Sequence, residues 1–154
     1  ADAMRAFFRA LAAAGWLAAP AQAEVLHDRL PEWAPLSSIL HDESTSTCRS
    51  IVADLASNAP VRPETRFAAR TGTIFGARWQ TTPANRTLLG QMSAAACADT
   101  WPKPLRDRFW RALGIDGAFV AIDPASRTAP AQRLGLYAPN VGLIVLIDWT
   151  AQPE

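Results

Sequence analysis

The sequence predicts an α+β fold class: a mainly antiparallel sheet of about five strands packed with about three helices, after an N-terminal signal peptide. Three observations lead to this prediction. Several stretches alternate apolar and polar residues, or are short and wholly apolar, as strands are. Others carry apolar residues at helical spacing. The expected order is a helix, two strands, two helices and three strands, which suits helices packed on an antiparallel sheet.

The N-terminal segment has the three parts of a secretory signal peptide. Arg5 and Arg9 make it positive, Leu11–Ala19 is an unbroken apolar run, and Pro20 precedes the small residues of Ala21-Gln22-Ala23. A membrane-spanning helix needs about 20 apolar residues, whereas this run lies between an arginine and a proline. We therefore expect a cleaved signal peptide over residues 1–23. A buried amphipathic helix and an uncleaved anchor are the alternatives.

Cleavage is expected between Ala23 and Glu24, and Ala1–Ala3, which precede Met4, are expected to be a remnant outside the fold. Since residue 24 is not cysteine, a lipid-modified N-terminus is not indicated. Residues 24–154 have the length of a single globular domain with one core. Arginine is used almost to the exclusion of lysine, as in GC-rich bacterial genes. In a bacterium, export by a signal peptide leads to the periplasm or out of the cell, so we expect a periplasmic or secreted protein.

The whole chain has a formal charge of +1, and the signal peptide carries this excess, so residues 24–154 are neutral. Neutrality argues against a globally basic nucleic-acid binder. The charges are nevertheless segregated: Glu24–Ser57 is acidic, and Arg62–Arg86 is rich in arginine with Glu64 as its single acid. The two segments lie together and neutralise each other, or both are solvated faces, or the basic one meets an anionic partner.

Cys48 and Cys97 are the two cysteines of the chain. Because two cysteines in an exported chain most simply pair, we expect a Cys48–Cys97 disulfide that joins two helices. Closing a loop of about 50 residues would stabilise the fold by roughly 4 kcal/mol in the chain-entropy model. Two buried free thiols or one reactive cysteine are the alternatives.

The first expected elements precede residue 58. Residues 25–35 are interrupted by prolines and are expected to be irregular, and Leu36–Leu40 to form one helical turn. Ser44–Thr47 offer N-caps for a helix that continues to Ser57. Its buried face would carry Cys48, Ile51 and Leu55.

Residues 64–82 have strand periodicity on both sides of a turn that contains glycine. A three-residue turn, Arg70–Gly72, pairs Phe67 with Phe75 and Glu64 with Arg78, and it is the register we prefer. A two-residue turn at Thr71-Gly72 is the alternative. The side chains that would face the core are Phe67, Phe75, Ala77 and Trp79.

Two helices and three strands are expected in the second half. The helices are Asn85–Ala98 and Leu105–Leu113, the latter ended by Gly114. The strands are Ala118–Ile122, Leu134–Tyr137 and Leu143–Trp149, the last two forming a hairpin. Because Leu143–Ile147 is apolar at every position, it is expected to be a central strand covered on both faces.

Two short clusters, His27-Asp28 and His41-Asp42-Glu43, combine histidine with carboxylates. Folded together, His27, His41 and Asp42 would offer a divalent ion two imidazoles and a carboxylate. Their spacing matches no short metal-binding motif, so we expect solvated surface residues and no metal or other cofactor. The catalytic motifs Gly-x-Ser-x-Gly and His-Glu-x-x-His do not occur.

Candidate partner-binding residues come from the basic hairpin and from two turns. The polar side chains of the hairpin point away from the expected core, and flanking arginines extend this basic face. A tryptophan in a proline-bounded turn could anchor a partner, although we favour the alternative that it covers the edge of the core. The candidates are Arg66, Arg78, Gln80, Arg62, Arg86, Trp33 and Trp101.

Export, a disulfide, segregated charge and no catalytic motif together predict a small periplasmic protein that acts by binding another protein, and the basic hairpin face would suit an acidic one. An inhibitor, an immunity protein or an envelope-assembly factor would be of this kind. The alternative from a different class is a small secreted hydrolase, metal-dependent through His27 and His41.

Overall fold

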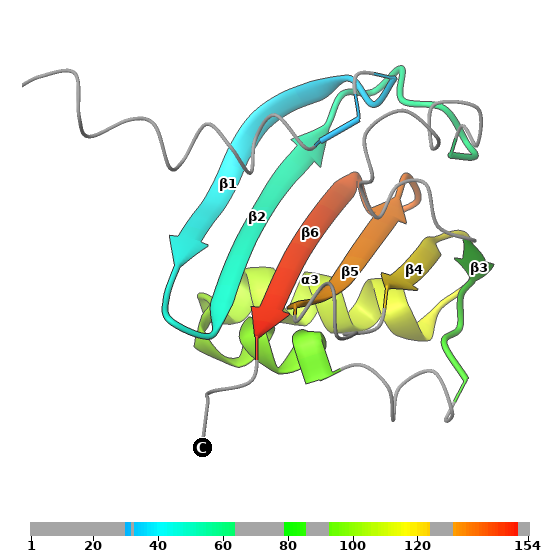
Figure 1. The fold of residues 1–154 in the computed structure, drawn as a ribbon. Coiled ribbons are helices and arrows are strands. Elements are labelled where there is room, and N and C mark those ends of the chain that lie inside the picture. The colour runs from blue at the N-terminus through cyan, green and yellow to red at the C-terminus, as the bar shows by residue number, and fades with distance from the viewer. Residues whose placement is uncertain (1–29, 32, 64–78, 86–92, 124–130, 151–154) are drawn as a thin grey trace, which may run out of the picture.

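A computed structural model of the chain describes residues 30–31, 33–63, 79–85, 93–123 and 131–150. Within them, one six-stranded sheet has the order β1-β2-β6-β5-β4-β3, with every neighbouring pair antiparallel (Figure 1). A 3₁₀ helix, η2, and an α-helix, α3, accompany the sheet. The bounds are β1 Leu36–Ser44, β2 Cys48–Leu55, β3 Gln80–Thr81, η2 Ser93–Thr100, α3 Lys103–Gly114, β4 Phe119–Asp123, β5 Ala131–Ala138 and β6 Leu143–Thr150.

The predicted fold class is wrong. It expected about five strands and about three helices, whereas the described residues form six strands and two helices and are mostly sheet. The error lies before residue 58, where both the helical turn Leu36–Leu40 and the helix ending at Ser57 are strands. Residues 36–44 form β1 and residues 48–55 form β2, which pair with each other as a hairpin.

β2 was mistaken for a helix because both of its faces are covered. Ser50, Ile51, Val52 and Ala53 are consecutive and all buried, so the alternation that identifies a half-exposed strand is missing. The apolar positions Ile51 and Leu55 then fit helical spacing equally well. The β-branched pair Ile51-Val52 favours a strand. In the structure the segment is a strand, because it is hydrogen-bonded to β1 along one edge and to β6 along the other.

The later elements confirm their predictions. α3 buries Leu105, Phe109 and Leu113 as expected, and β4 covers the predicted Ala118–Ile122 to within one residue at each end. β5 and β6 form the predicted hairpin. The turn between them ends at Gly142, whose φ of 68° is left-handed and suits glycine.

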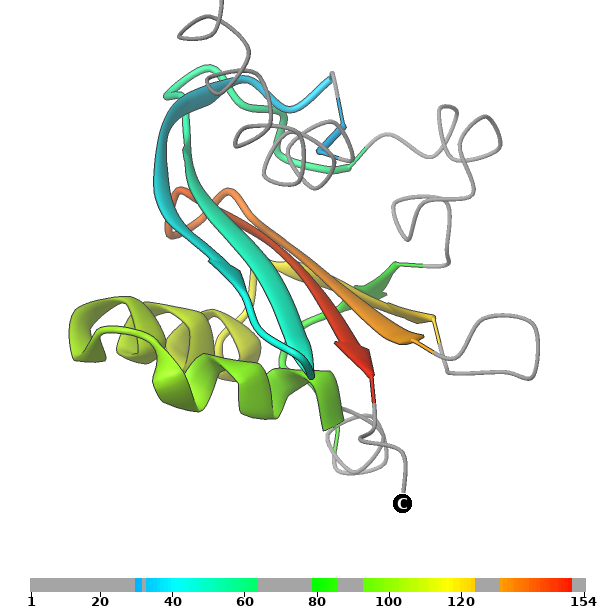
Figure 2. The same ribbon diagram turned by 60° about the vertical axis from the view of Figure 1, so that its left-hand side comes forward.

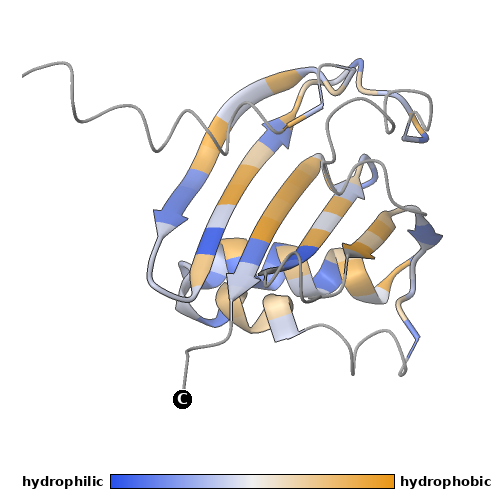
Figure 3. Ribbon diagram, viewed as in Figure 1, coloured by the Kyte–Doolittle hydropathy of each residue, from blue (hydrophilic) through white to orange (hydrophobic). Residues whose placement is uncertain are grey.

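β6 confirms the prediction of a central strand. It lies between β2 and β5, and all residues from Leu143 to Asp148 are buried. Figure 3 shows the resulting hydrophobic band along most of its length. Leu143, Val145 and Ile147 face the helices, and Ile144 and Leu146 belong to a separate apolar cluster on the opposite face.

Two predictions fall wholly or partly outside the described residues. The hairpin pairs Phe67–Phe75 and Glu64–Arg78 lie outside them, and the described remnant, Gln80–Thr81, pairs with β4. Of the predicted helix Asn85–Ala98, residues 86–92 lie outside. Residues 93–98 are helical but belong to the 3₁₀ helix η2.

The two faces of the sheet are covered differently, as Figure 2 shows. The helices cover one face, where Val52, Val145 and Leu134 meet Phe109 and Leu113. On the opposite face, Leu30 and Ala34 of the segment before β1 join an apolar cluster with sheet residues. No helix within the described residues is long and apolar enough to cross a membrane.

Candidate functional site

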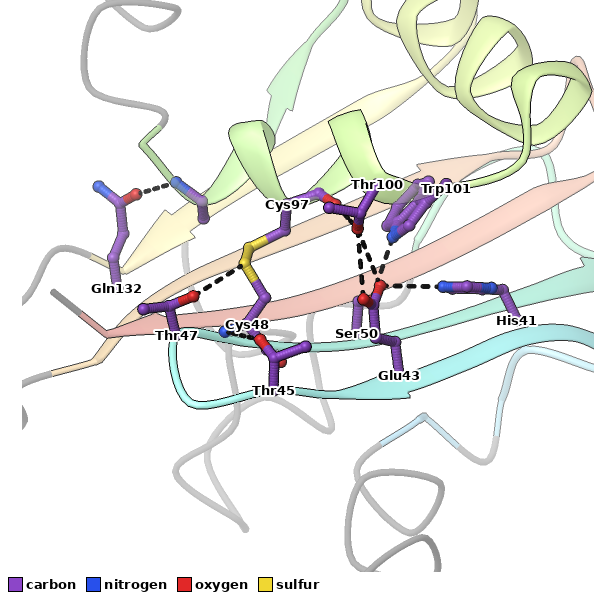
Figure 4. The surroundings of a disulfide bond; sticks show 11 residues. His41, Glu43, Thr45, Thr47, Cys48, Ser50, Cys97, Thr100, Trp101 and Gln132 are labelled. Atoms are coloured by element: carbon purple, nitrogen blue, oxygen red, sulfur yellow. Dashed lines mark hydrogen bonds and ion pairs between the residues drawn. A yellow bond between two sulfur atoms is a disulfide. The ribbon is translucent and has the colours of Figure 1, made fainter. Parts of the chain in front are cut away.

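The predicted disulfide is confirmed: Cys48 and Cys97 are bonded, with their Cα atoms 5.8 Å apart (Figure 4). It does not join two helices as expected, because Cys48 begins β2 while Cys97 lies in η2. Cys97 is buried at 1% exposure and packs in the core beside the sheet. The bond therefore ties the β1–β2 hairpin to the layer of helices.

A group of polar side chains lies beside this bond, as Figure 4 shows. His41 Nε2 lies 3.1 Å from Glu43 Oε2, and Thr100 Oγ1 donates to the same carboxylate at 3.1 and 3.3 Å. We call His41, Glu43 and Thr100, together with Ser50 and Trp101, the hairpin–helix cluster. It connects β1 and β2 with η2 and the turn that follows η2.

Strand geometry brings the cluster together. His41 and Glu43 are two residues apart in β1, so both side chains point toward the helices. Their partners in β2 are Val52 and Ser50. The hydroxyl of Ser50 accepts a hydrogen bond from Trp101 Nε1 at 3.2 Å.

The contacts give the cluster a structural role. Trp101 is 3% exposed and Ser50 0%, so a substrate could not reach the Ser50 hydroxyl without opening the fold. The ring of Trp101 also lies 5.7 Å from His41 and 5.2 Å from Phe109, measured between centroids. The cluster thus fastens the hairpin to α3 as well as to η2.

Of the three residues considered for a metal site, the structure describes His41 and Asp42, and these two do not lie on the same face of the sheet. Asp42 pairs with Ile51, which faces away from the helices, so His41 and Asp42 project from opposite faces of β1. His27 lies outside the described residues. In the part of the chain that the structure describes, no group of three or more His, Cys, Asp or Glu side chains lies close enough together to hold a metal ion.

The candidate partner-binding residues have different surroundings. Trp101 is in the core, and Trp33 is half-buried with its ring edge-on to Tyr137 at 4.9 Å, which agrees with the alternative that both cover the core. Gln80 in β3 and Arg62 are exposed. Arg66, Arg78 and Arg86 lie outside the described residues.

Charged contacts that the sequence did not reveal join elements far apart in the chain. Arg108 of α3 donates at 3.0 Å both to Asp54 Oδ1 of β2 and to the carbonyl oxygen of Val141. On the other face, Arg133 Nε lies 3.5 Å from Asp148 Oδ1, and Arg49 is the neighbour of Asp148 in β2. No sequence pattern could have found these pairs, because they depend on register.

Tyr137 is the single tyrosine of the chain and is completely buried in β5. Its hydroxyl donates to the carbonyl oxygen of Pro60. Burial, which disfavours the charged phenolate, raises the pKa of Tyr137 to about 12. The loop after β2 is thereby linked to the centre of the sheet.

Comparison of the chain with protein-family models, with curated proteins and with solved structures gave no match.

Proposed function

We propose that this protein is exported, processed between Ala23 and Glu24, and acts in the periplasm or outside the cell by binding another protein. The Cys48–Cys97 disulfide carries the proposal, because such bonds persist in oxidising compartments and are rare in the reducing cytosol. The N-terminal sequence, with its positive, apolar and small-residue parts, supports the same location.

The contacts of His41 give this residue a structural part in the fold. His41 Nε2 lies 3.1 Å from Glu43, whose carboxylate also lies within hydrogen-bonding distance of the Thr100 hydroxyl. These groups hold the hairpin against the helices. Binding accounts for these contacts without a catalytic step, and metal analysis tests the hydrolase alternative.

The proposed partner is a protein with acidic groups. Arg62 is exposed and forms no ion pair with any residue that the structure describes. It stands at the start of the arginine-rich segment, whose further members Arg66, Arg78 and Arg86 we keep as proposed contacts. The guanidinium group of arginine can donate two parallel hydrogen bonds to one carboxylate, which favours a partner with acidic groups.

Export is tested by the intact mass of the full chain expressed in a bacterium that has a periplasm. The expected product is periplasmic, begins at Glu24, and is lighter by two hydrogen atoms than its reduced form. A product that stays with the membrane and keeps Leu11–Ala19 would contradict export as a processed protein.

Binding is tested by affinity capture from periplasmic extract, with the Arg66→Glu/Arg78→Glu variant beside the wild type. One partner should be enriched with the wild type and weakened in the variant, mostly through slower association at low salt. Metal analysis of the purified wild type is the second arm: a stoichiometric metal ion would favour the hydrolase.

A further inference from the structure

The outer face of α3 carries a partly exposed tryptophan, Trp110. A helix face that meets only solvent is not stabilised by such a residue. Its inner face is formed by Leu105, Phe109, Ala112 and Leu113, all buried. Trp110 lies outside this stripe and is 40% exposed. Figure 2 shows α3 on the far side of the sheet from the segment before β1, with its outer side turned away from the rest of the described fold.

The indole of Trp110 is held in position but left open. Its ring meets Phe109 edge-on, with 5.4 Å between centroids, so a core residue supports it from below. One turn further along the helix is Gly114, where an added Cβ would meet nothing within 4 Å. Gly114 has no side chain to cover the indole from the next turn, so the exposed part of the ring is accessible to an apolar group of a partner.

The charges around Trp110 are predominantly positive. Lys103 is paired with Asp107 at 2.7 Å, and Arg108 turns inward to Asp54. Arg106 donates to a neutral backbone carbonyl, that of Asp99, at 3.2 Å. Among the described residues neither Arg106 nor Arg111 has a carboxylate partner.

We propose that the outer face of α3, formed by Arg106, Trp110 and Arg111, is a docking surface for an acidic protein that carries an apolar side chain among its carboxylates. Tryptophan and arginine are the residues that most often dominate binding energy at protein interfaces. The two arginines would take carboxylates, and Trp110 would take the apolar group. This surface deepens the proposed function and rests on it for the class of partner.

A protein fits this face better than a continuous polyanion. Asp107 lies in the middle of the exposed stripe and neutralises Lys103, which breaks the positive charge that a lipid surface or a nucleic-acid backbone would need. Carboxylates on a folded partner can avoid Asp107 and still meet Arg106 and Arg111. The exposed indole of Trp110 adds an apolar contact that a purely charged ligand would not use.

The test is a titration of the isotope-labelled oxidised protein, followed by NMR, with three peptides of equal length. They consist of Glu-Glu-Leu repeats, of Glu alone, and of Lys-Lys-Leu repeats. The Glu-Glu-Leu peptide should shift amides of residues 103–115 and bind more tightly than the Glu peptide. The Lys-Lys-Leu peptide should not bind there, because it would face like charges.

Three variants separate the contributions. Arg106→Glu/Arg111→Glu should weaken binding of the Glu-Glu-Leu peptide by about tenfold or more at low salt. Trp110→Ala should also weaken it by about tenfold, and should abolish the preference over the Glu peptide. Ser46→Glu, which adds a negative charge in the exposed turn between β1 and β2, should change binding less than about twofold. The melting temperature of each variant shows whether it is folded.

The proposal is overturned if the shifts fall outside residues 103–115, if Ser46→Glu weakens binding as much as the double variant, or if Trp110→Ala binds like the wild type. Binding to anionic phosphatidylglycerol vesicles without binding to the Glu-Glu-Leu peptide would make the surface a membrane contact and also overturn it. Capture of the periplasmic partner separates the two ideas. A partner retained equally by wild type and Trp110→Ala would leave the proposed function intact and refute this surface.

Discussion

Trp101 donates its indole hydrogen to the hydroxyl of Ser50 over 3.2 Å, although 51 residues separate them in sequence. Both side chains are buried where the helices meet β2. The hydroxyl gives the buried indole nitrogen a hydrogen-bond partner. The bond therefore decides how the turn after η2 sits against the β1–β2 hairpin.

Replacing Ser50 with alanine should destabilise the protein by about 1–3 kcal/mol, because it leaves the buried N–H of Trp101 without this acceptor. Urea unfolding followed by tryptophan fluorescence measures the change. Ser38→Ala is the matched control, because the Ser38 hydroxyl is exposed and its hydrogen bond to Asp54 is long, at 3.5 Å. This substitution should change stability by less than about 0.5 kcal/mol. Equal effects of the two substitutions would contradict this account.

Removing the disulfide by Cys48→Ala/Cys97→Ala should destabilise the protein by up to about 4 kcal/mol, since the bond closes a chain separation of 49 residues. The reduced wild type should behave like the double variant, because both lose the same constraint on the unfolded chain. The midpoint of denaturant unfolding measures both. A native protein whose two thiols are freely alkylated without reductant would exclude the bond.

The single tyrosine predicts how stability depends on alkaline pH. The pKa of Tyr137 is raised to about 12 in the folded protein, from about 10 in an unfolded chain. The folded state thus holds the phenol proton more tightly. The stability that the neutral phenol contributes is complete below about pH 10 and is lost as the pH rises through about 12.

Ultraviolet absorbance of the phenolate follows this one group, since no other tyrosine is present. Its titration should be delayed to about pH 12 in the folded protein and return to about pH 10 in denaturant. Tyr137→Phe should show a smaller loss of stability over this pH range. Titration near pH 10 in the folded protein would show that the hydroxyl is not buried.

Two glycines form a further matched pair. Gly142 has a φ of 68°, so Gly142→Ala should destabilise the β5–β6 hairpin by about 1 kcal/mol. Gly114 ends α3, does not have a positive φ, and has open space at its Cβ position. Gly114→Ala should therefore be neutral or stabilise by a few tenths of a kcal/mol. Thermal unfolding of both variants checks the opposite signs.

Much of the second half of the fold could be predicted because its patterns are local. Leu105, Phe109 and Leu113 recur at helical spacing between Pro104 and Gly114, which favours a helix, and the short apolar run Leu143–Ile147 favours a covered strand. The disulfide followed from the two cysteines themselves. The hairpin–helix cluster could not be predicted, because pairing His41 with Glu43 and Thr100 requires β1 to be a strand and its register with β2 to be known.

By itself the sequence indicated α3, the closing hairpin β5–β6 and the disulfide, because the first two depend on residues close together in the chain and the third on the two cysteines that the chain contains. Tertiary structure alone decided that residues 48–55 are a strand. Ser50 and Val52 turn toward the helices while Ile51 and Ala53 join the cluster on the other face. With both faces covered, burial carries no period, and only hydrogen bonding to β1 and β6 distinguishes a strand from a helix.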